Sequence, residues 1–158
     1  MSRAPVRRLL RAGLAAGVTD ALFSSVLVVA FYHSTFARLW HGVAAAVLGP
    51  AALTGGPGTT AFGLLVHFGV AFGWAAVFLA LYERSAGLRG FVARPAGVAA
   101  AAAAYGPLVW LVMSLVVLPA LLRRPPSVNA RWVVQLLGHV PFVALPIVAL
   151  VRDPGRPR

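Results

Sequence analysis

The sequence predicts an all-α polytopic membrane protein, an antiparallel four-helix transmembrane bundle with one interfacial helix. Hydrophobic residues make up 60% and charged residues 11% of its 158 residues, whereas a soluble domain is about half apolar and about a quarter charged. Its mean hydropathy is +0.86. Four apolar runs each reach the roughly 20 residues that a helix needs to cross a bilayer. Because these runs and their connections occupy nearly the whole chain, we expect a single membrane domain over residues 1–158.

The first predicted span covers residues 13–32, which read GLAAGVTDALFSSVLVVAFY. Arginines precede it, as in a secretory signal, but its apolar part exceeds the roughly 7 to 15 residues of a signal core and no A-x-A site follows it. We therefore expect a retained span. Gly13 and Gly17 form a GxxxG pair that lets another helix come close. They share one helical stripe with Asp20 and Ser24, so the face that carries the acid is expected to point at protein.

A shorter helix is expected between the first two spans, over residues 36–48. Its apolar residues recur at helical spacing and Gly49 and Pro50 end it, which is typical of a helix lying in the membrane interface. These apolar residues are Phe36, Leu39, Trp40, Val43 and Val47. A fifth span or a re-entrant hairpin is the alternative, but the roughly 14 residues available are fewer than a span requires. We expect His33 and His41 to face solvent.

The other three spans are expected over residues 60–81, 96–118 and 132–151, each flanked by arginine, glycine or proline, as helix ends at an interface are. The connections between these spans are short, so consecutive helices are expected to run antiparallel. Gly69 and Gly73 in the second span are expected to form a packing surface for another helix.

The arginines set the expected orientation, because cytoplasmic loops carry more Arg and Lys than outer loops. With the N-terminus inside, ten arginines fall on the cytoplasmic side and four outside. This count predicts a multi-pass protein of the bacterial inner membrane with both termini cytoplasmic. The ten are Arg3, Arg7, Arg8, Arg11, Arg84, Arg89, Arg94, Arg152, Arg156 and Arg158, and the four are Arg38, Arg123, Arg124 and Arg131.

Charge and composition also bear on partners. The net charge is +11 and the chain contains no lysine. Its arginines stand singly or in short groups beside apolar runs, whereas nucleic-acid binding needs a basic face with aromatic residues between the charges. The expected partners are the lipid bilayer and anionic headgroups at the arginine-rich cytoplasmic ends, and no nucleic acid is expected. Because there is no cysteine, disulfides, iron–sulfur clusters and thiolate metal sites are excluded.

Three ionisable residues inside apolar runs form the candidate site, namely Asp20, His67 and His139. An acid at the bilayer centre costs about 2.5 to 3.5 kcal/mol on insertion scales, so such residues are functional candidates. The three lie at similar depths, with an offset of about 8 Å at the usual helical rise. A cluster at the midplane and a relay along the membrane normal both fit. Hydrogen-bonding support is expected from Ser24, Tyr105, Ser114 and Gln135.

Three functions fit this pattern. The first is a small transport or proton-coupled protein, because histidine and a partly desolvated carboxyl group can pass or sense a proton; four short helices enclose little volume, so transport could require a homo-oligomer. The second is a structural or accessory subunit whose polar groups only specify helix packing. The third is a redox protein that binds haem or a divalent metal through His67, His139 and Asp20. No cofactor is expected under the first two, and the absence of a G-x-S-x-G motif argues against an enzyme.

Short motifs also give the chain a resemblance. Residues 12–17 read AGLAAG ahead of an acid, residues 63–67 read GLLVH in a helix that leads to a Tyr-Glu pair at 82–83, and a Gly-His pair stands at 138–139. In these features the sequence resembles a group of small bacterial inner-membrane proteins of unknown function. The resemblance implies a four-span membrane protein, and it implies no activity.

Overall fold

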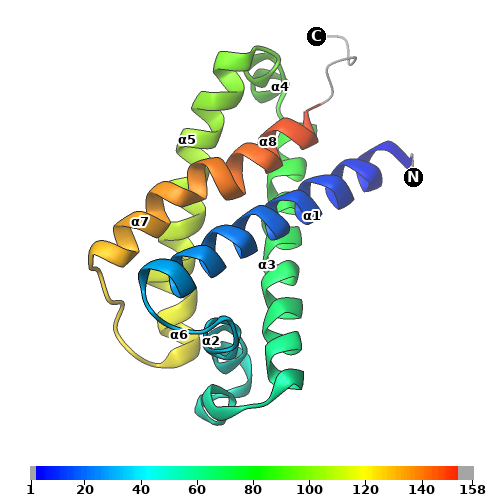
Figure 1. Ribbon diagram of the computed structural model, residues 1–158. Coiled ribbons are helices and arrows are strands. Elements are labelled where there is room, and N and C mark those ends of the chain that lie inside the picture. Colours follow the sequence, from blue (N-terminus) through cyan, green and yellow to red (C-terminus); the bar gives the residue numbers. More distant parts are fainter. Residues whose placement is uncertain (1–2, 153–158) are drawn as a thin grey trace.

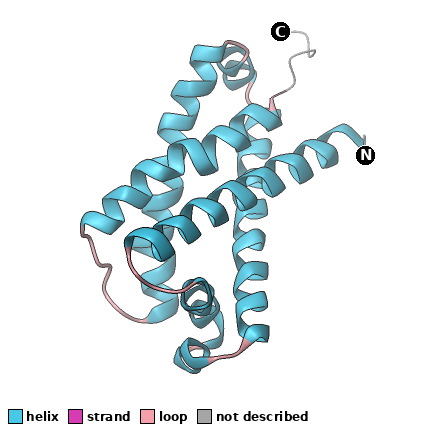
Figure 2. Cartoon of the chain, viewed as in Figure 1, coloured by secondary structure: helices cyan, strands magenta, loops and turns pink. Residues whose placement is uncertain are grey.

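The computed structural model describes residues 3–152, and all regular elements in that range are helical (Figures 1 and 2). Arg156 and Arg158, which enter the count of cytoplasmic arginines, lie outside the described residues. Segments labelled η are π-helical, except η2, which is a 3-10 helix. In chain order the elements are α1 (Arg3–Val26), η1 (Leu27–Phe31), α2 (Phe36–Leu48), η2 (Pro50–Thr54), α3 (Pro57–Arg84), α4 (Ala86–Val92), α5 (Pro95–Val112), η3 (Met113–Val117), α6 (Leu118–Leu122), α7 (Ala130–His139), η4 (Val140–Ala144) and α8 (Leu145–Val151).

Four helices are long and apolar enough to cross a membrane, which confirms the predicted fold class. They run over Ala4–Phe31, Pro57–Arg84, Pro95–Leu122 and Ala130–Val151. Each contains one predicted span, apart from residue 32 at the end of the first. The helix of the first span already begins at Arg3, because the arginines before the apolar run are themselves good helix formers.

π-helical segments interrupt three of the four spans, whereas α3 is α-helical throughout. In η4 the N–H of Leu145 donates to the carbonyl of Val140, five residues back. Pro141 has no N–H for the carbonyl of Leu137, and the N–H of Val140 donates to that carbonyl instead. Such segments often occur at functional positions in helices.

The spans pack as one bundle with distinct ends (Figure 1). α1 packs along α3 and against α8, while α5 packs against α7, η4 and α8. α2 lies on α3 and contacts α6 at one end of the bundle, and α4 contacts α3 and α5 at the other end. At the α4 end, Arg8 binds Glu83 at 2.9 Å and donates to the carbonyl of Val151 at 3.3 Å. One arginine therefore ties three spans together.

The connection between the second and third spans contains a short helix that the sequence did not predict. The hydroxyl of Ser85 caps α4 by accepting from the N–H of Leu88 at 3.1 Å. Arg89 then reaches back and donates to the carbonyls of Tyr82 and Glu83, in the last turn of α3. Basic side chains commonly satisfy the free carbonyls at a helix C-terminus. These bonds fix the turn from α3 into α5.

The expected interfacial helix is present as α2, and it is packed more deeply against the bundle than its amphipathic pattern predicts. Gly63 of α3 makes this approach possible, because a Cβ at that position would stand 2.0 Å from the carbonyl oxygen of Trp40. The Trp40 side chain is only 1% exposed. The buried residues of α2 are Trp40, His41, Ala44 and Ala45.

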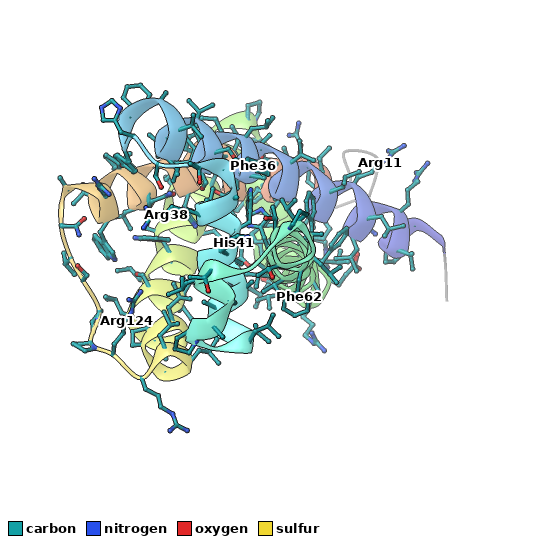
Figure 3. All side chains as sticks on the ribbon, turned by 60° about the horizontal axis from the view of Figure 1, so that its bottom comes forward. Arg11, Phe36, Arg38, His41, Phe62 and Arg124 are labelled. Atoms are coloured by element: carbon teal, nitrogen blue, oxygen red, sulfur yellow. The ribbon has the colours of Figure 1, made fainter. Side chains whose placement is uncertain are left out.

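His41 is also more deeply buried than the sequence predicts. It is 7% exposed, and its Nε2 lies 3.2 Å from the carbonyl oxygen of Gly56 and 3.0 Å from the hydroxyl of Thr60. Figure 3 shows His41 on the side of α2 that faces α3. The expectation that His41 faces solvent is therefore wrong, whereas His33 is exposed as expected. A hydrogen-bonded histidine helps to hold the start of α3 against α2.

A packed apolar core fills the half of the bundle next to α4. It is built from the early part of α1, the late part of α3, the early part of α5 and the end of the fourth span, with Val92 of α4 at its edge. Its buried residues are Ala12, Ala16, Ala75, Phe78, Tyr82, Val92, Val98, Ala102, Tyr105, Val109, Val143, Ala144, Ile147, Val148 and Val151.

Candidate functional site

A cavity of about 430 Å³ lies in the opposite half of the bundle, next to α2 and α6. All four spans line it, and α2 and α6 complete its wall. Most lining side chains are apolar. The polar ones are Asp20, Ser24, His67, Gln135 and His139. The three residues of the predicted site therefore face one cavity, and two of the four supporting residues line it with them.

Asp20 and His67 lie closest together. The Oδ2 atom of Asp20 in α1 is 3.9 Å from the Nδ1 atom of His67 in α3. Their side chains are 15% and 14% exposed, respectively. The attraction between a carboxylate and a protonated imidazole at this separation is strengthened by the poorly screening surroundings.

The remaining ring nitrogen of His67 fixes the chemistry of this pair. Nε2 lies 3.0 Å from the carbonyl oxygen of Gly17, and a carbonyl oxygen can only accept. Nε2 therefore carries a hydrogen, and Nδ1 is the nitrogen that gains or loses a proton. Since Nδ1 faces Asp20, the titrating atom of the histidine points at the acid. Gly17 contributes both this acceptor and the close approach of the two helices.

His139 is held in the same manner by its own helix. Its Nδ1 lies 2.8 Å from the carbonyl oxygen of Gln135, one turn earlier, so Nδ1 carries a hydrogen and Nε2 is the titrating nitrogen. The ring centroids of His139 and Trp110 are 4.8 Å apart. Close packing between α5 and α7 supports this arrangement, because a Cβ on Gly106 would stand 2.7 Å from the carbonyl oxygen of His139.

Four buried polar atoms around the cavity have no hydrogen-bond partner. They are Oδ1 of Asp20, Oε1 of Gln135, and the indole Nε1 atoms of Trp40 and Trp110. All four residues line the cavity. A buried polar group without a partner costs about 1 to 3 kcal/mol. These atoms are shielded in this conformation, so they mark positions in the cavity wall where polar groups are not satisfied within the described chain.

Trp40 is the site residue that sequence reasoning missed. The sequence pattern places Trp40 on the apolar face of an interfacial helix, yet its ring stands edge-on to His67 with the ring centroids 5.1 Å apart. No hydropathy pattern distinguishes a tryptophan at a lipid surface from one over a cavity. The nearest signal was its place beside His41, because polar residues within an apolar helix mark a protein-facing side.

The supporting residues divide into two groups. The Nε2 of Gln135 donates to the hydroxyl of Ser24 at 3.4 Å, across the cavity wall. Ser114 instead accepts from the indole of Trp132 at 3.0 Å, and Tyr105 donates to the carbonyl of Trp74 at 2.7 Å. The structure therefore brings Ser24 and Gln135 to the cavity, whereas Ser114 and Tyr105 do not line it.

The predicted packing glycines also divide. A Cβ on Gly13 would stand 2.2 Å from the ring of Phe72, and one on Gly17 would stand 2.5 Å from the ring of Phe68. These two glycines therefore admit α3 onto α1. A Cβ on Gly69 or Gly73 would meet no atom within 4 Å, so within residues 3–152 neither glycine admits another helix.

Similarity to other proteins does not add to these observations. The chain matches no protein-family profile, curated protein or solved structure. The resemblance carried by its short motifs therefore stays a prediction.

Metal and haem binding also stay predictions. The part of the chain that the structure describes holds no group of three His, Cys, Asp or Glu side chains that could bind a metal ion. His67 and His139 are each occupied at one ring nitrogen by a carbonyl oxygen. One nitrogen on each ring is left for any ligand.

Two hollows adjoin the cavity at the α2 and α6 end of the bundle. One, of about 520 Å³, shares Trp110 and Gln135 with the cavity wall and is also lined by Arg124 and Arg131. The other, of about 460 Å³, is lined by Arg38 and again by Arg131. Arg38 and Arg124 lie in the part of the molecule that Figure 3 brings forward. The cavity is thus acidic inside and has arginines outside it.

Proposed function

We propose that this chain is a small proton-coupled transport protein of the bacterial inner membrane, with Asp20, His67 and His139 as its proton-binding site. The observation that carries the proposal is the contact of 3.9 Å between Asp20 and the titrating nitrogen of His67, in a cavity that His139 also lines. Histidine changes charge between about pH 5 and pH 8. A carboxylate beside it can accept or return the same proton.

The two halves of the bundle support a transport role. Polar groups line the cavity half, whereas the half next to α4 is filled by a cluster of buried apolar side chains. A proton held at Asp20 is therefore separated from the α4 end until the helices move. The π-helical segments in three spans already depart from the regular α-helical hydrogen-bond pattern, so a helix can move there with little further loss of such bonds.

The alternative is a structural subunit whose polar groups only specify packing. The hydrogen bonds of Ser114 and Tyr105 fit that function, since both groups bond between helices and neither residue lines the cavity. The unpartnered Asp20 and Gln135 oxygens favour the first function, because a group retained for packing gains nothing from an unsatisfied atom.

Proton flux into liposomes tests the proposal. Purified protein is reconstituted around a trapped pH-sensitive dye, and a potassium gradient with valinomycin sets the membrane potential. We expect flux well above that of empty liposomes, reduced at least tenfold by Asp20→Asn, which keeps the side-chain shape but removes the titrating group. Flux equal to that of empty liposomes, or unchanged by Asp20→Asn, contradicts the proposal.

Glu83→Gln is the matched control. It also converts an acid to its amide, but Glu83 lies at the α4 end against Arg8 and does not line the cavity. We expect it to retain wild-type flux. Circular dichroism of both variants verifies that the helices are intact, so that lost flux is read as lost proton transfer.

A further inference from the structure

The cavity has the size and lining of a small-molecule site. Its volume of about 430 Å³ lies within the roughly 300 to 1,000 Å³ that such sites occupy. Apolar side chains from all four spans form most of the wall, and a few polar atoms stand among them. A proton alone needs no space of this kind. The cavity therefore has room for an organic molecule beside the proton-binding pair.

The charge of the cavity lining determines the sign of the charge that a bound molecule should carry. Asp20 is the only acidic residue in the cavity lining that the structure describes, and no arginine is part of that lining. The titratable groups that face Asp20 are His67 from α3 and His139 from α7, while the lining residues of α2, α5, η3, α6 and η4 include no acid or base. With both imidazoles neutral, an ionised Asp20 leaves one negative charge without a counter-charge.

The aromatic walls favour a cation as well. The ring of Trp40 contacts His67 and the ring of Trp110 contacts His139, and both tryptophans line the cavity. Trp40 is only 1% exposed, whereas Trp110 is partly exposed, so Trp110 is the tryptophan whose ring can attract a desolvated cation. The Asp20 side chain lines the cavity and is 15% exposed, and its Oδ1 atom has no hydrogen-bond partner among the described residues, so the carboxylate can take a positively charged partner. An acceptor, a negative charge and an aromatic ring together fit one ligand class.

We propose that the cavity binds a small monovalent lipophilic cation, in competition with a proton on the Asp20–His67 pair. The apolar body of the cation lies against Trp110 and the apolar lining of the cavity, and its charged end lies at Asp20. As the cation binds, the pair releases one proton to solvent, so one positive charge replaces another. This inference rests on the proposed proton-binding function and names the class of molecule that competes with the proton for the same site.

The arginines of the adjoining hollows make an anion the competing occupant. Arg124 and Arg131 line one hollow, and Arg38 and Arg131 line the other. Their charge favours an anion at the entrance, whereas Asp20 disfavours one inside the cavity. Ligands that differ only in charge separate the two.

Three probes of nearly equal shape test the charge. They are benzyltrimethylammonium, its neutral isostere neopentylbenzene, and phenylmethanesulfonate. Binding to the full-length protein in an uncharged detergent is measured by calorimetry at about pH 8 and about pH 5, which bracket the titration of imidazole. At the higher pH we expect benzyltrimethylammonium to bind at least tenfold more tightly than the other two. At the lower pH its affinity should fall at least tenfold, with proton release read from the dependence of the heat on buffer ionisation.

The variants follow the same logic. Asp20→Asn should weaken benzyltrimethylammonium at least tenfold and leave neopentylbenzene unchanged, while Glu83→Gln should bind as the wild type does. The inference is overturned if the neutral isostere binds as tightly as the cation, if phenylmethanesulfonate binds best, or if affinity is independent of pH. The probe comparison and the pH dependence use the wild-type protein, so they decide the question even if Asp20→Asn does not fold.

The outcome is separable from that of the proposed function. Proton flux in liposomes is measured without any organic cation. Flux that depends on Asp20, together with no binding of benzyltrimethylammonium, supports the proposed proton-binding function and contradicts the proposed cation site. Binding of benzyltrimethylammonium without proton flux supports the proposed cation site and contradicts the proposed proton-transport function.

Discussion

At the residue scale, Thr19 compensates for a bond that a proline removes from the neighbouring span. In a regular α-helix the carbonyl of Phe142 would accept from residue 146, but that residue is Pro146, which has no N–H. The hydroxyl of Thr19 in α1 donates to this carbonyl. The same hydroxyl also lies 2.7 Å from the carbonyl oxygen of Ala15 in its own helix. Since an unsatisfied carbonyl is costly in a membrane, this contact should stabilise the pairing of α1 with the fourth span.

A double-mutant cycle tests this contact. We expect Thr19→Val to lower the free energy of unfolding by roughly 0.6 to 1.7 kcal/mol, the range for hydrogen bonds between membrane helices. In a Pro146→Ala background the loss should be smaller, because the new N–H can donate to the Phe142 carbonyl. Unfolding in a titration with a denaturing detergent, followed by circular dichroism, gives the four values. Equal losses in the two backgrounds would show that Thr19 does not compensate for the proline.

The site residues differ in how far the sequence could reveal them. Asp20, His67 and His139 could be selected because ionisable groups are rare within membrane spans. Their depths could be estimated only to within about 8 Å, which left a cluster and a relay equally open. The contact between Asp20 and His67 depends on how α1 is rotated against α3, and the hydropathy of an apolar helix does not set that rotation. Trp40 could not be selected for the same reason.

At the scale of elements, small residues decide which helix faces meet. Gly17 lies where the ring of Phe68 approaches, whereas Gly73 on α3 faces open space within the described chain. The sequence presents both as glycines four residues from another glycine, so the pattern alone treats them alike. Lipid chains and apolar side chains are equally apolar. The sequence therefore cannot show which of the two glycine pairs meets a helix of the same chain.

Alanine substitutions at Gly13 and Gly73 separate the two roles. Gly13→Ala places a Cβ 2.2 Å from the ring of Phe72, and overpacking of this kind costs about 1 to 3 kcal/mol. Gly73→Ala meets no atom within 4 Å, and alanine favours helix by up to about 1 kcal/mol over glycine. We expect the first variant to unfold at a lower detergent fraction than the wild type, and the second at the same or a higher one. Destabilisation by Gly73→Ala instead would point to a second copy of the chain on that face.

The presence of four long apolar helices followed from the sequence because bilayer thickness fixes the length of a span. α4 did not, because its seven residues form no apolar stripe and its stability comes from the Ser85 cap and the Arg89 bonds to α3. The depth of α2 was also underestimated. Its amphipathic pattern is satisfied by a lipid surface, and only Gly63 on another helix lets it pack against protein. The depth at which α2 packs depends on contacts between elements, so the sequence of α2 alone does not predict it.

At the scale of the whole molecule, the bundle is divided into a polar cavity half and an apolar core half. α2, α6 and the segment before α7 lie at the cavity end, and α4 lies at the core end (Figure 1). Ser24 lines the cavity, whereas Ala75, about two turns past the His67 level of α3, is 0% exposed. An aqueous reagent that reaches the site in this conformation should therefore come from the α2 and α6 end.

The absence of native cysteine makes this division measurable with single cysteine substitutions. In intact vesicles, we expect a small membrane-impermeant thiol reagent to label Ser24→Cys from the same side as Ser127→Cys, which is exposed in the segment before α7. Gly90→Cys, exposed on α4, should label only from the opposite side, and Ala75→Cys should stay unlabelled because its side chain is buried in the core. If the arginine count gives the orientation, Gly90 is cytoplasmic. Labelling of Ser24→Cys from the Gly90 side, or of Ala75→Cys at a comparable rate, would mean that the cavity opens toward α4, and the proposed closure of that half would be wrong.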